Sequence, residues 1–168
     1  RKNITIILDA FALSLKSFPN LELVIAGKKG WYYEQIFLHL QKLGIQEKVR
    51  FLGYVPLSDL PALYNAAHIF VYPSYYEGFG LPPLEAMQCG TPVITSDVSS
   101  LPEVMGNKGI MVSPNNAVKL GKEIKKLIPD SAYRNNQIQF GIEQARKFSW
   151  KKTADLTIEI YESVLDNS

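Results

Sequence analysis

The stretch HIFVYPSYYEGFGLPPLEAMQCGTPVITS, residues 68–96, contains two short apolar segments on either side of a loop and a helical segment. The apolar segments, HIFVYP and PVITS, are apolar on both faces, which is typical of strands buried in a parallel sheet. Between them, residues 82–88 predict a helix with proline in its first turn, where proline is favoured. A strand, a helix and a second strand in this order predict a β-α-β unit.

The same alternation continues on both sides of this unit. Apolar residues recur at helical spacing near the start of the chain and predict a helix over residues 3–17. Further strands are expected over residues 21–27, which end at Gly27, and over 49–52 and 109–113. Further helices are expected over 32–43, 58–65, 115–128, 131–147 and 150–165, with Ser58 or Asp59 capping the second of them.

Short apolar strands that alternate with helices predict an α/β fold, a doubly wound parallel sheet of the Rossmann-like class. The 168 residues suit a single domain with a sizeable core, and no repeat or linker divides them. The last helix, over 150–166, follows the compact sheet domain. It is expected either to pack on this domain or to reach across to a neighbouring one.

The charge of the chain argues against a nucleic-acid partner. Its formal net charge is +2, and its only cluster of lysines surrounds Glu123 on a helix, which is typical of a solvated face. The single cysteine, Cys89, allows no disulfide within the chain and fits a reducing compartment. We expect it to be a small buried side chain. No apolar run is long enough to span a bilayer and no signal peptide opens the chain, so a cytoplasmic location is expected.

The loop after HIFVYP has the composition of a ligand-binding loop. In open parallel sheets, ligands bind at the carboxyl ends of the strands. Gly78 and Gly80 allow the backbone to approach a ligand closely, and their N–H groups, with those of Phe79 and Leu81, come directly before a helix. A helix start offers unpaired N–H donors and a partial positive charge, so this loop suits a phosphate.

Two carboxylates, Glu77 and Glu85, bracket this loop. They are poorly suited to share a phosphate, because like charges repel, and better suited to accept hydrogen bonds from sugar or ribose hydroxyls. The residues therefore favour a nucleotide sugar as ligand. Two simpler interpretations stay open at this point: Glu85 as a helix acid favoured by the dipole, and Glu77 as a solvated loop residue.

The segment EGFGLPPLEAMQCGTPVITSDVSSLPEV, residues 77–104, resembles the signature of the GT-B glycosyltransferases of the large retaining family 4. That family has a Glu, seven residues and a second Glu, and Glu77 and Glu85 match it without a gap. Arg1-Lys2-Asn3, GKKGW, FLGYVP, DLPALYNAAHIFVYPS and FSW also fall where the family has them. The pairing of RKN with GKKGW resembles mannosyl- and related transferases of surface polysaccharides.

This resemblance implies the second, donor-binding domain of a two-domain enzyme. It implies that Lys2 binds the donor diphosphate, Glu85 the ribose hydroxyls and Glu77 the hydroxyls of the transferred sugar. The remaining donor-binding residues that it implies are Gly27, Tyr54, Val55, Gly78, Phe79, Gly80 and Leu81. Of these, Tyr54 and Val55 belong to the turn near the base.

The implied reaction transfers a sugar from a donor such as GDP-mannose or a UDP-sugar with retention at the anomeric carbon. Lys2 and the helix start would stabilise the charge that develops on the leaving phosphate. No Asp-x-Asp motif is present, and the fold class generally works without a bound metal, so no metal or other cofactor is expected. We expect Glu77 to position the sugar rather than to act as the nucleophile.

The acceptor site would belong to a first domain, so this chain alone is expected to be inactive. The acceptor would be a saccharide or a lipid-linked glycan, with the full-length enzyme at the inner face of a membrane. His39 and His68 are expected to be structural or surface residues. Trp31, Tyr75 and Tyr76 are candidates to stack on a base or a sugar.

Three alternatives remain at this stage. A non-catalytic flavodoxin-like binding module would have no need of paired glutamates. A glycosidase would use Glu77 and Glu85 as acid and base at a defined separation, but it has no use for Lys2 or a phosphate-binding helix start. A nucleotide-sugar epimerase or a phosphorylase would share the fold.

Overall fold

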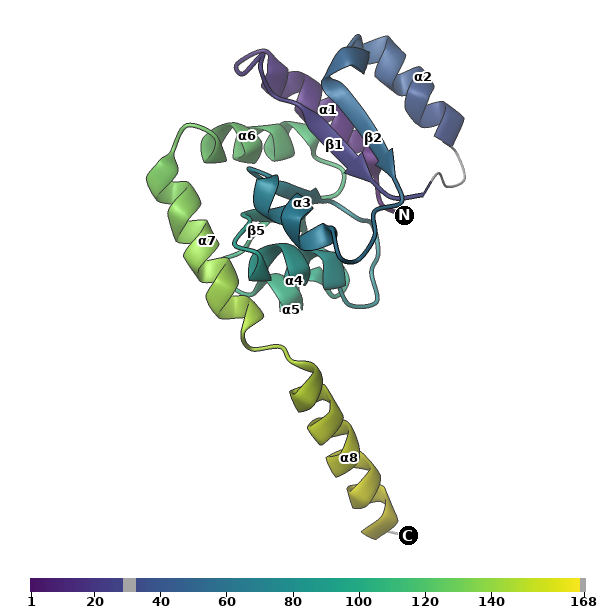
Figure 1. Cartoon of the computed structure of the whole chain (residues 1–168), viewed down its shortest axis with the longest axis vertical. Coiled ribbons are helices and arrows are strands. Elements are labelled where there is room, and N and C mark those ends of the chain that lie inside the picture. Colours follow the sequence, from purple (N-terminus) through teal and green to yellow (C-terminus); the bar gives the residue numbers. More distant parts are fainter. Residues whose placement is uncertain (29–32, 167–168) are drawn as a thin grey trace.

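The structure, a computed structural model, describes residues 1–28 and 33–166 (Figure 1). Its strands are β1 (Leu23–Ala26), β2 (Val49–Gly53), β3 (Phe70–Tyr72), β4 (Val93–Ser96) and β5 (Ile110–Val112). Its helices are α1 (Ile4–Leu15), α2 (Tyr33–Leu43), α3 (Leu60–Ala66), α4 (Leu81–Gln88), α5 (Leu101–Met105), α6 (Ala117–Leu127), α7 (Ser131–Ala145) and α8 (Trp150–Asp166). Every predicted strand and helix is present, and the sequence prediction lacked only α5 and a 3₁₀ turn over Gln46–Lys48.

The paired strands are all parallel, which confirms the α/β class with helices around a parallel sheet. β1 pairs with β2, and β4 lies between β3 and β5. Within the described residues the sheet is therefore divided into two parts, because no ladder joins β1 to β3. β4 is buried along its whole length, as expected for a strand with a neighbour on each side and helices on both faces.

Helix α1 holds the two parts of the sheet together. One side of α1, including Leu8 and Phe11, packs with β1, β2 and α2. The other side, including Ile7 and Ala10, packs with β4, β5 and α6. α6 crosses α1 closely, since a Cβ atom added at Gly121 would lie 3.2 Å from the Ala10 carbonyl oxygen.

A second core lies under the loop that precedes α4. It contains Met87 of α4, Val104 and Met105 of α5, and Ala145 of α7, all at most 2% exposed. α7 packs on α4 through Gly141, where an added Cβ atom would lie 3.2 Å from Met87 Cγ. This packing sets the position of α4, and with it the end of the loop that carries Gly78 and Gly80.

The helix caps follow the prediction only in part. Asn116 caps α6 and Asp130 caps α7 by accepting hydrogen bonds from the N–H groups of Lys119 and Tyr133. The predicted side-chain cap of α3 is wrong: Asp59 stands at the N-cap position, but neither its carboxylate nor the hydroxyl of Ser58 accepts a hydrogen bond from that helix. The hydroxyl of Ser58 instead donates to the carboxylate of Asp59 at 2.9 Å, so the two polar groups satisfy each other.

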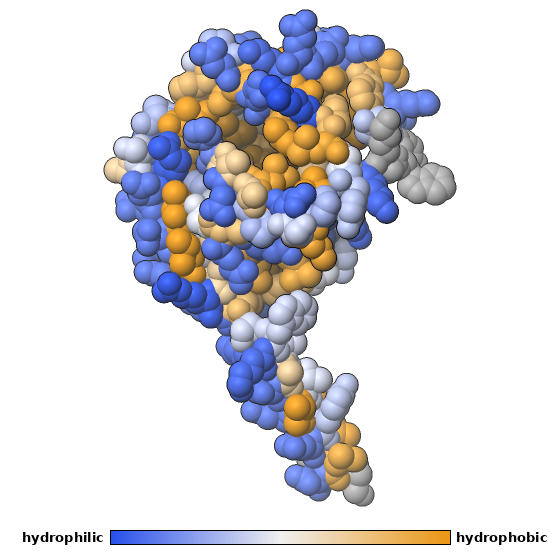
Figure 2. Space-filling view, viewed as in Figure 1, coloured by the Kyte–Doolittle hydropathy of each residue, from blue (hydrophilic) through white to orange (hydrophobic). Residues whose placement is uncertain are grey.

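Helix α8 is exposed along its whole length and extends away from the body of the domain (Figure 1). The sequence allowed α8 either to pack on this domain or to reach a neighbouring one, and in the structure it does not pack on this domain. It carries exposed apolar side chains, and Figure 2 shows hydrophobic surface along it and in a hollow in the upper part of the body. Within residues 1–28 and 33–166, no helix is both long enough and apolar enough to cross a membrane.

Truncation of two apolar residues of α6 should affect stability differently, because only one of them is buried. Leu120 is 0% exposed and Val118 is 58% exposed. We expect Leu120→Ala to lower the free energy of unfolding by about 2–5 kcal/mol, because it leaves a cavity between α6 and α1. Val118→Ala is the control and should change it by less than about 0.5 kcal/mol. Urea unfolding measures both, and equal losses would contradict this account of the core.

Candidate functional site

The candidate site lies at the carboxyl ends of the parallel strands, where the loop of residues 73–80 leaves β3 and enters α4. The N-terminal residues Arg1, Lys2 and Asn3 lie against this loop. The N–H of Tyr75 donates to the Arg1 carbonyl at 3.0 Å. The amide of Asn3 donates to the carbonyls of Pro73 at 3.1 Å and Pro114 at 2.7 Å. These bonds hold Lys2 beside the loop.

Lys2 and Glu77, far apart in sequence, form an ion pair at 2.8 Å between Nζ and Oε1. The ammonium of Lys2 also donates to the hydroxyl of Tyr72 and lies 4.4 Å from the centre of its ring. The carboxyl side chain of Glu77 is 10% exposed and that of Lys2 is 43% exposed. The structure thus brings the two predicted catalytic residues together, with the ammonium accessible from solvent.

The pKa shifts of the three groups follow from these contacts. Burial alone would lower the pKa of Lys2, but its hydrogen bonds to Glu77 and Tyr72 outweigh burial and raise it. Burial alone would raise the pKa of Glu77, but the hydrogen bond from Lys2, those from neighbouring hydroxyls and the charge of Lys2 together outweigh burial and lower it. Burial raises the pKa of Tyr72. At neutral pH the site therefore holds an ammonium, a carboxylate and a protonated phenol.

Two serines after β4 hold the backbone of the Glu77 loop. The Ser99 hydroxyl donates to the Glu77 carbonyl at 2.5 Å and accepts from the Glu77 N–H at 3.2 Å. The Ser100 hydroxyl lies 3.0 Å from the Glu77 carbonyl and 2.6 Å from that of Phe79. Ser99 has a φ of 60°, a left-handed conformation that is uncommon for serine. The clamp fixes the peptide on which Glu77 is carried.

The N–H groups of Gly78, Phe79, Gly80 and Leu81 donate no hydrogen bond to another described residue. They are consecutive and lie at the start of α4, whose next two residues are prolines without N–H groups. Gly80 has a φ of 122°, and a Cβ atom there would lie 3.0 Å from Leu101 Cδ2. Only glycine fits this position without strain, and the loop presents a row of free donors.

Glu85 lies one turn further along α4 and is half-buried. Its Oε2 accepts a hydrogen bond of 2.9 Å from the hydroxyl of Tyr64, which lies on α3. The structure thus places both glutamates beside the row of N–H groups, one before it and one on the helix that it opens.

Gly27, Tyr54 and Val55 lie at the ends of β1 and β2. The N–H of Gly27 donates to the Gly53 carbonyl at 2.7 Å, and the ammonium of Lys28 lies 5.3 Å from the ring of Tyr54. Tyr54 is exposed and Val55 is half-buried. No hydrogen bond of the described chain joins this group to the Glu77 loop. Trp31, the predicted stacking residue, lies outside the described residues.

The remaining candidates add no contact to the two glutamates. His39 bonds Asp9 at 2.7 Å, and His68 is exposed, so both are structural or surface residues as predicted. Tyr75 and Tyr76 are exposed at the rim of the loop. Cys89 is half-buried rather than buried, because it follows the end of α4. Burial and then the charge of Glu85 raise its pKa, which keeps the thiol protonated.

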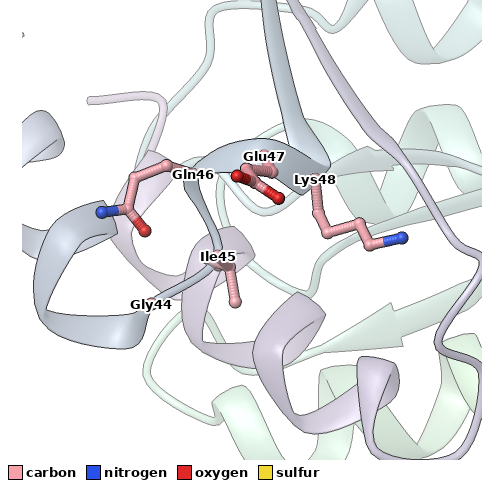
Figure 3. A pocket seen from close by; sticks show the side chains of 5 residues that line it. All are labelled: Gly44, Ile45, Gln46, Glu47 and Lys48. Atoms are coloured by element: carbon pink, nitrogen blue, oxygen red, sulfur yellow. The ribbon is translucent and has the colours of Figure 1, made fainter.

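A hollow of about 380 Å³ is lined by residues 44–48 (Figure 3). It lies after α2, away from Glu77 and Glu85. Its side chains point apart, with Gln46 and Lys48 on opposite sides (Figure 3). It lacks converging polar groups and is not the candidate site. Among the described residues, no cluster of three or more His, Cys, Asp or Glu side chains could hold a metal ion.

Residues 1–144 match a family described as glycosyl transferases group 1. The chain belongs to this family. The match includes the anchored Lys2, both glutamates and the loop between them. It ends before α8, the helix that lies apart from the body of the domain.

Named relatives of this glycosyl transferase group 1 domain include the O-antigen chain mannosyltransferase B of Escherichia coli. The two are 43% identical over 164 residues, which is 96% of this chain and 43% of the relative. Sucrose-phosphate synthase from Thermosynechococcus elongatus is 30% identical, with a TM-score of 0.88 over 100% of this chain and 43% of that one. The HepE structure from Anabaena with UDP-glucose has a TM-score of 0.85, 23% identity, and coverage of 94% and 44%. The chain thus spans less than half the length of these proteins.

Sequence reasoning missed four residues of the candidate site: Tyr64, Tyr72, Ser99 and Ser100. Tyr72 lies next to the end of the predicted strand HIFVYP, directly before the loop, so its position was a usable signal. Ser100 stands before Leu-Pro-Glu, a pattern typical of a helix cap, but its hydroxyl bonds the Glu77 loop instead. Tyr64 and Ser99 reach the site only through tertiary contacts.

The backbone of the loop predicts a contrast between its two glycines. Gly80→Ala should lower the free energy of unfolding by about 1–3 kcal/mol, because alanine is strained at this φ and collides with Leu101. Gly78 has nothing within 4 Å of an added Cβ atom and is the matched control. Chemical denaturation measures both variants. A loss as large for Gly78→Ala would show that the glycine geometry is wrongly assigned.

The ion pair predicts that part of the folding stability is lost at acid pH. Because the pKa of Glu77 is lowered from 4.5, its contribution is present above pH 4.5 and is lost as the pH falls through the folded-state pKa. Lys2 behaves in the opposite sense, since its pKa is raised from 10.5 and its contribution is lost only at more alkaline pH. Glu77→Gln should therefore destabilise the chain at pH 7 and have less effect near pH 3.

The destabilisation by Glu77→Gln at pH 7 should exceed that near pH 3 by about 1 kcal/mol or less, because the exposed side of Lys2 is screened by water. The free energy of unfolding is measured across this pH range for the wild type and the variant. Glu159→Gln, on the exposed helix α8, is the control and should show no such dependence. A Glu77→Gln effect that is constant with pH would contradict the ion pair.

Proposed function

We propose that this chain is the donor-binding half of a glycosyltransferase that uses a nucleotide sugar. The full enzyme would transfer the sugar, with retention of anomeric configuration, to a saccharide or lipid-linked acceptor. One observation carries the proposal: four consecutive N–H groups without a partner in residues 1–28 and 33–166 lie between two glutamates, beside an anchored lysine. The N–H groups and the lysine suit a phosphate, and the two glutamates suit sugar hydroxyls.

The diphosphate would lie against the N–H groups of residues 78–81 and the ammonium of Lys2. An ammonium has three protons, and Glu77 and Tyr72 accept two of them, which leaves one for a phosphate oxygen. The partial positive charge of the α4 start adds to this attraction. The two prolines after Leu81 remove no donor that a helix would have used at these positions.

The hydroxyls of the donor would lie against the two carboxylates. We propose Glu85 for the ribose and Glu77 for the transferred sugar. A carboxylate oxygen has two acceptor sites, so Glu85 can accept from a ligand while it accepts from Tyr64. Gly27, Tyr54 and Val55 would lie nearer the base, since they end the neighbouring strands β1 and β2 at the same edge.

The chemical role of the site would be to stabilise the leaving group. Departure of the nucleoside diphosphate builds negative charge on its phosphate, and Lys2 and the N–H groups would stabilise that charge. In this proposal they supply the positive charge without a metal ion. Glu77 is held by Lys2 and its peptide by Ser99, so it suits positioning of the sugar better than attack on the anomeric carbon.

The donor base and sugar are proposed more broadly, as GDP-mannose or a UDP-sugar. The name of the mannosyltransferase relative from Escherichia coli, at 43% identity, supports mannose. The acceptor side would come from a further domain of the protein, and α8, with its exposed apolar side chains, would cross to that domain. This chain alone would then bind donors without turnover.

The test is isothermal titration of the chain with GDP, UDP and ADP. We expect at least one to bind, and Glu85→Ala to weaken it by about 10-fold or more, because hydrogen bonds to a charged group are lost. Glu159→Ala, on α8, is the matched control and should leave the affinity unchanged. No binding at millimolar nucleotide would contradict the donor site, and unchanged affinity of Glu85→Ala would contradict the ribose assignment.

A further inference from the structure

Tyr64 contacts the candidate site although it lies on another helix, α3. Its residue is 8% exposed, and its hydroxyl donates to Oε2 of Glu85 at 2.9 Å. The hydroxyl is the one polar atom of a ring that otherwise packs among Leu84, Met87 and Val93. A buried phenol directed at a half-buried carboxylate fixes the orientation of that carboxylate.

Tyr64 is itself held at two points, its backbone and its ring. Its backbone carbonyl accepts a 2.7 Å hydrogen bond from the hydroxyl of Thr91, which lies just before β4. The ring of Phe70 packs against it edge to face, with the ring centres 5.3 Å apart. Tyr64 is therefore tied to the sheet, and the carboxylate of Glu85 is tied to the sheet through it.

The direction of the hydrogen bond is settled by the protonation of the phenol. Burial, followed by the hydrogen bond to Glu85, raises the pKa of Tyr64, so the hydroxyl keeps its proton and donates it. Tyr64 occupies one acceptor site on Oε2. The second site of Oε2 and both sites of Oε1 remain for a ligand.

The same row of rings reaches the other glutamate. Phe70 stacks on Tyr72 with ring centres 5.8 Å apart, and Tyr72 accepts from Lys2, which pairs with Glu77. Glu85 is thus bonded to Tyr64 and Glu77 to Lys2, and an aromatic row, Tyr64, Phe70 and Tyr72, runs between these two contacts.

We propose that Tyr64 is a positioning residue that orients the Glu85 carboxylate toward the vicinal hydroxyls of a ribonucleoside diphosphate. The proposal rests on the ribose role of Glu85 proposed above and extends it, because it assigns the preference for a ribose to a pair of side chains. A ligand without the 2′ and 3′ hydroxyls gains nothing from a correctly oriented carboxylate. Loss of the phenol hydroxyl should therefore affect ribonucleotides selectively.

The experiment compares two ligands on the same proteins by isothermal titration. The ligands are whichever of GDP, UDP and ADP binds the wild-type chain most tightly, and its 2′,3′-dideoxy counterpart. Tyr64→Phe removes one oxygen and keeps the ring against Phe70. We expect it to weaken the ribonucleotide by about 5-fold and the dideoxynucleotide by less than about 2-fold.

Two further variants separate positioning from structure. Tyr133→Phe removes the same atom from α7, remote from the site, and should leave both affinities unchanged. In a Glu85→Ala background, Tyr64→Phe should have no further effect on the ribonucleotide, because Tyr64 acts only through that carboxylate. The ratio of the two affinities is measured on one protein sample, so partial unfolding of a variant does not imitate the expected result.

The outcomes are distinct. Equal weakening of both ligands by Tyr64→Phe, or a further loss in the Glu85→Ala background, would overturn the positioning role and leave a structural one. If Glu85→Ala weakens the ribonucleotide more than the dideoxynucleotide but Tyr64→Phe does not, this inference is overturned and the proposed function stands. If Glu85→Ala weakens both ligands alike, or the wild type binds none of them, the ribose role of Glu85 fails and the inference fails with it.

Discussion

Helix α1 packs on both parts of the divided sheet, and the rest of the structure depends on this packing. Leu8 and Phe11 bury their side chains with β1, β2 and α2, while Ile7 and Ala10 bury theirs with β4, β5 and α6. No ladder among the described residues joins the two parts of the sheet, so these apolar contacts hold the two parts next to each other. The same helix begins at Ile4, two residues after Lys2, and its position therefore determines where the ammonium of the site lies.

The site itself is organised by the balance of charge around Glu77. A buried carboxylate is costly unless it is paired, and the ion pair with Lys2 offsets that cost, while Ser99 fixes the Glu77 peptide. The pairing leaves the exposed side of Lys2 directed to solvent beside free N–H groups. A structural requirement of the loop, neutralisation of Glu77, thus also prepares a place where an anion is favoured.

Much of the fold followed from the sequence because periodicity is local. Short apolar runs predicted all five strands of the described chain, and helical spacing predicted the long helices. The 3₁₀ turn at 46–48 and the five-residue helix α5 escaped, since segments this short carry too few residues to show a period. The caps showed a further limit: the polar residues before α3 satisfy each other, and tertiary geometry rather than residue type decided this.

The sequence by itself determined the α/β class, the family, and the loop that carries Glu77, Gly78 and Gly80 and leads into the helix of Glu85, because residue order alone places a glycine-rich turn between a strand and a helix. Only the tertiary structure decided how those groups are held. Tyr64, Tyr72 and Ser99 come from other elements, and Lys2 lies 75 positions before the glutamate that it pairs with. Contacts between distant segments depend on how helices and strands pack, which no local pattern encodes. The loop is therefore a property of the sequence, and the oriented carboxylates are a property of the fold.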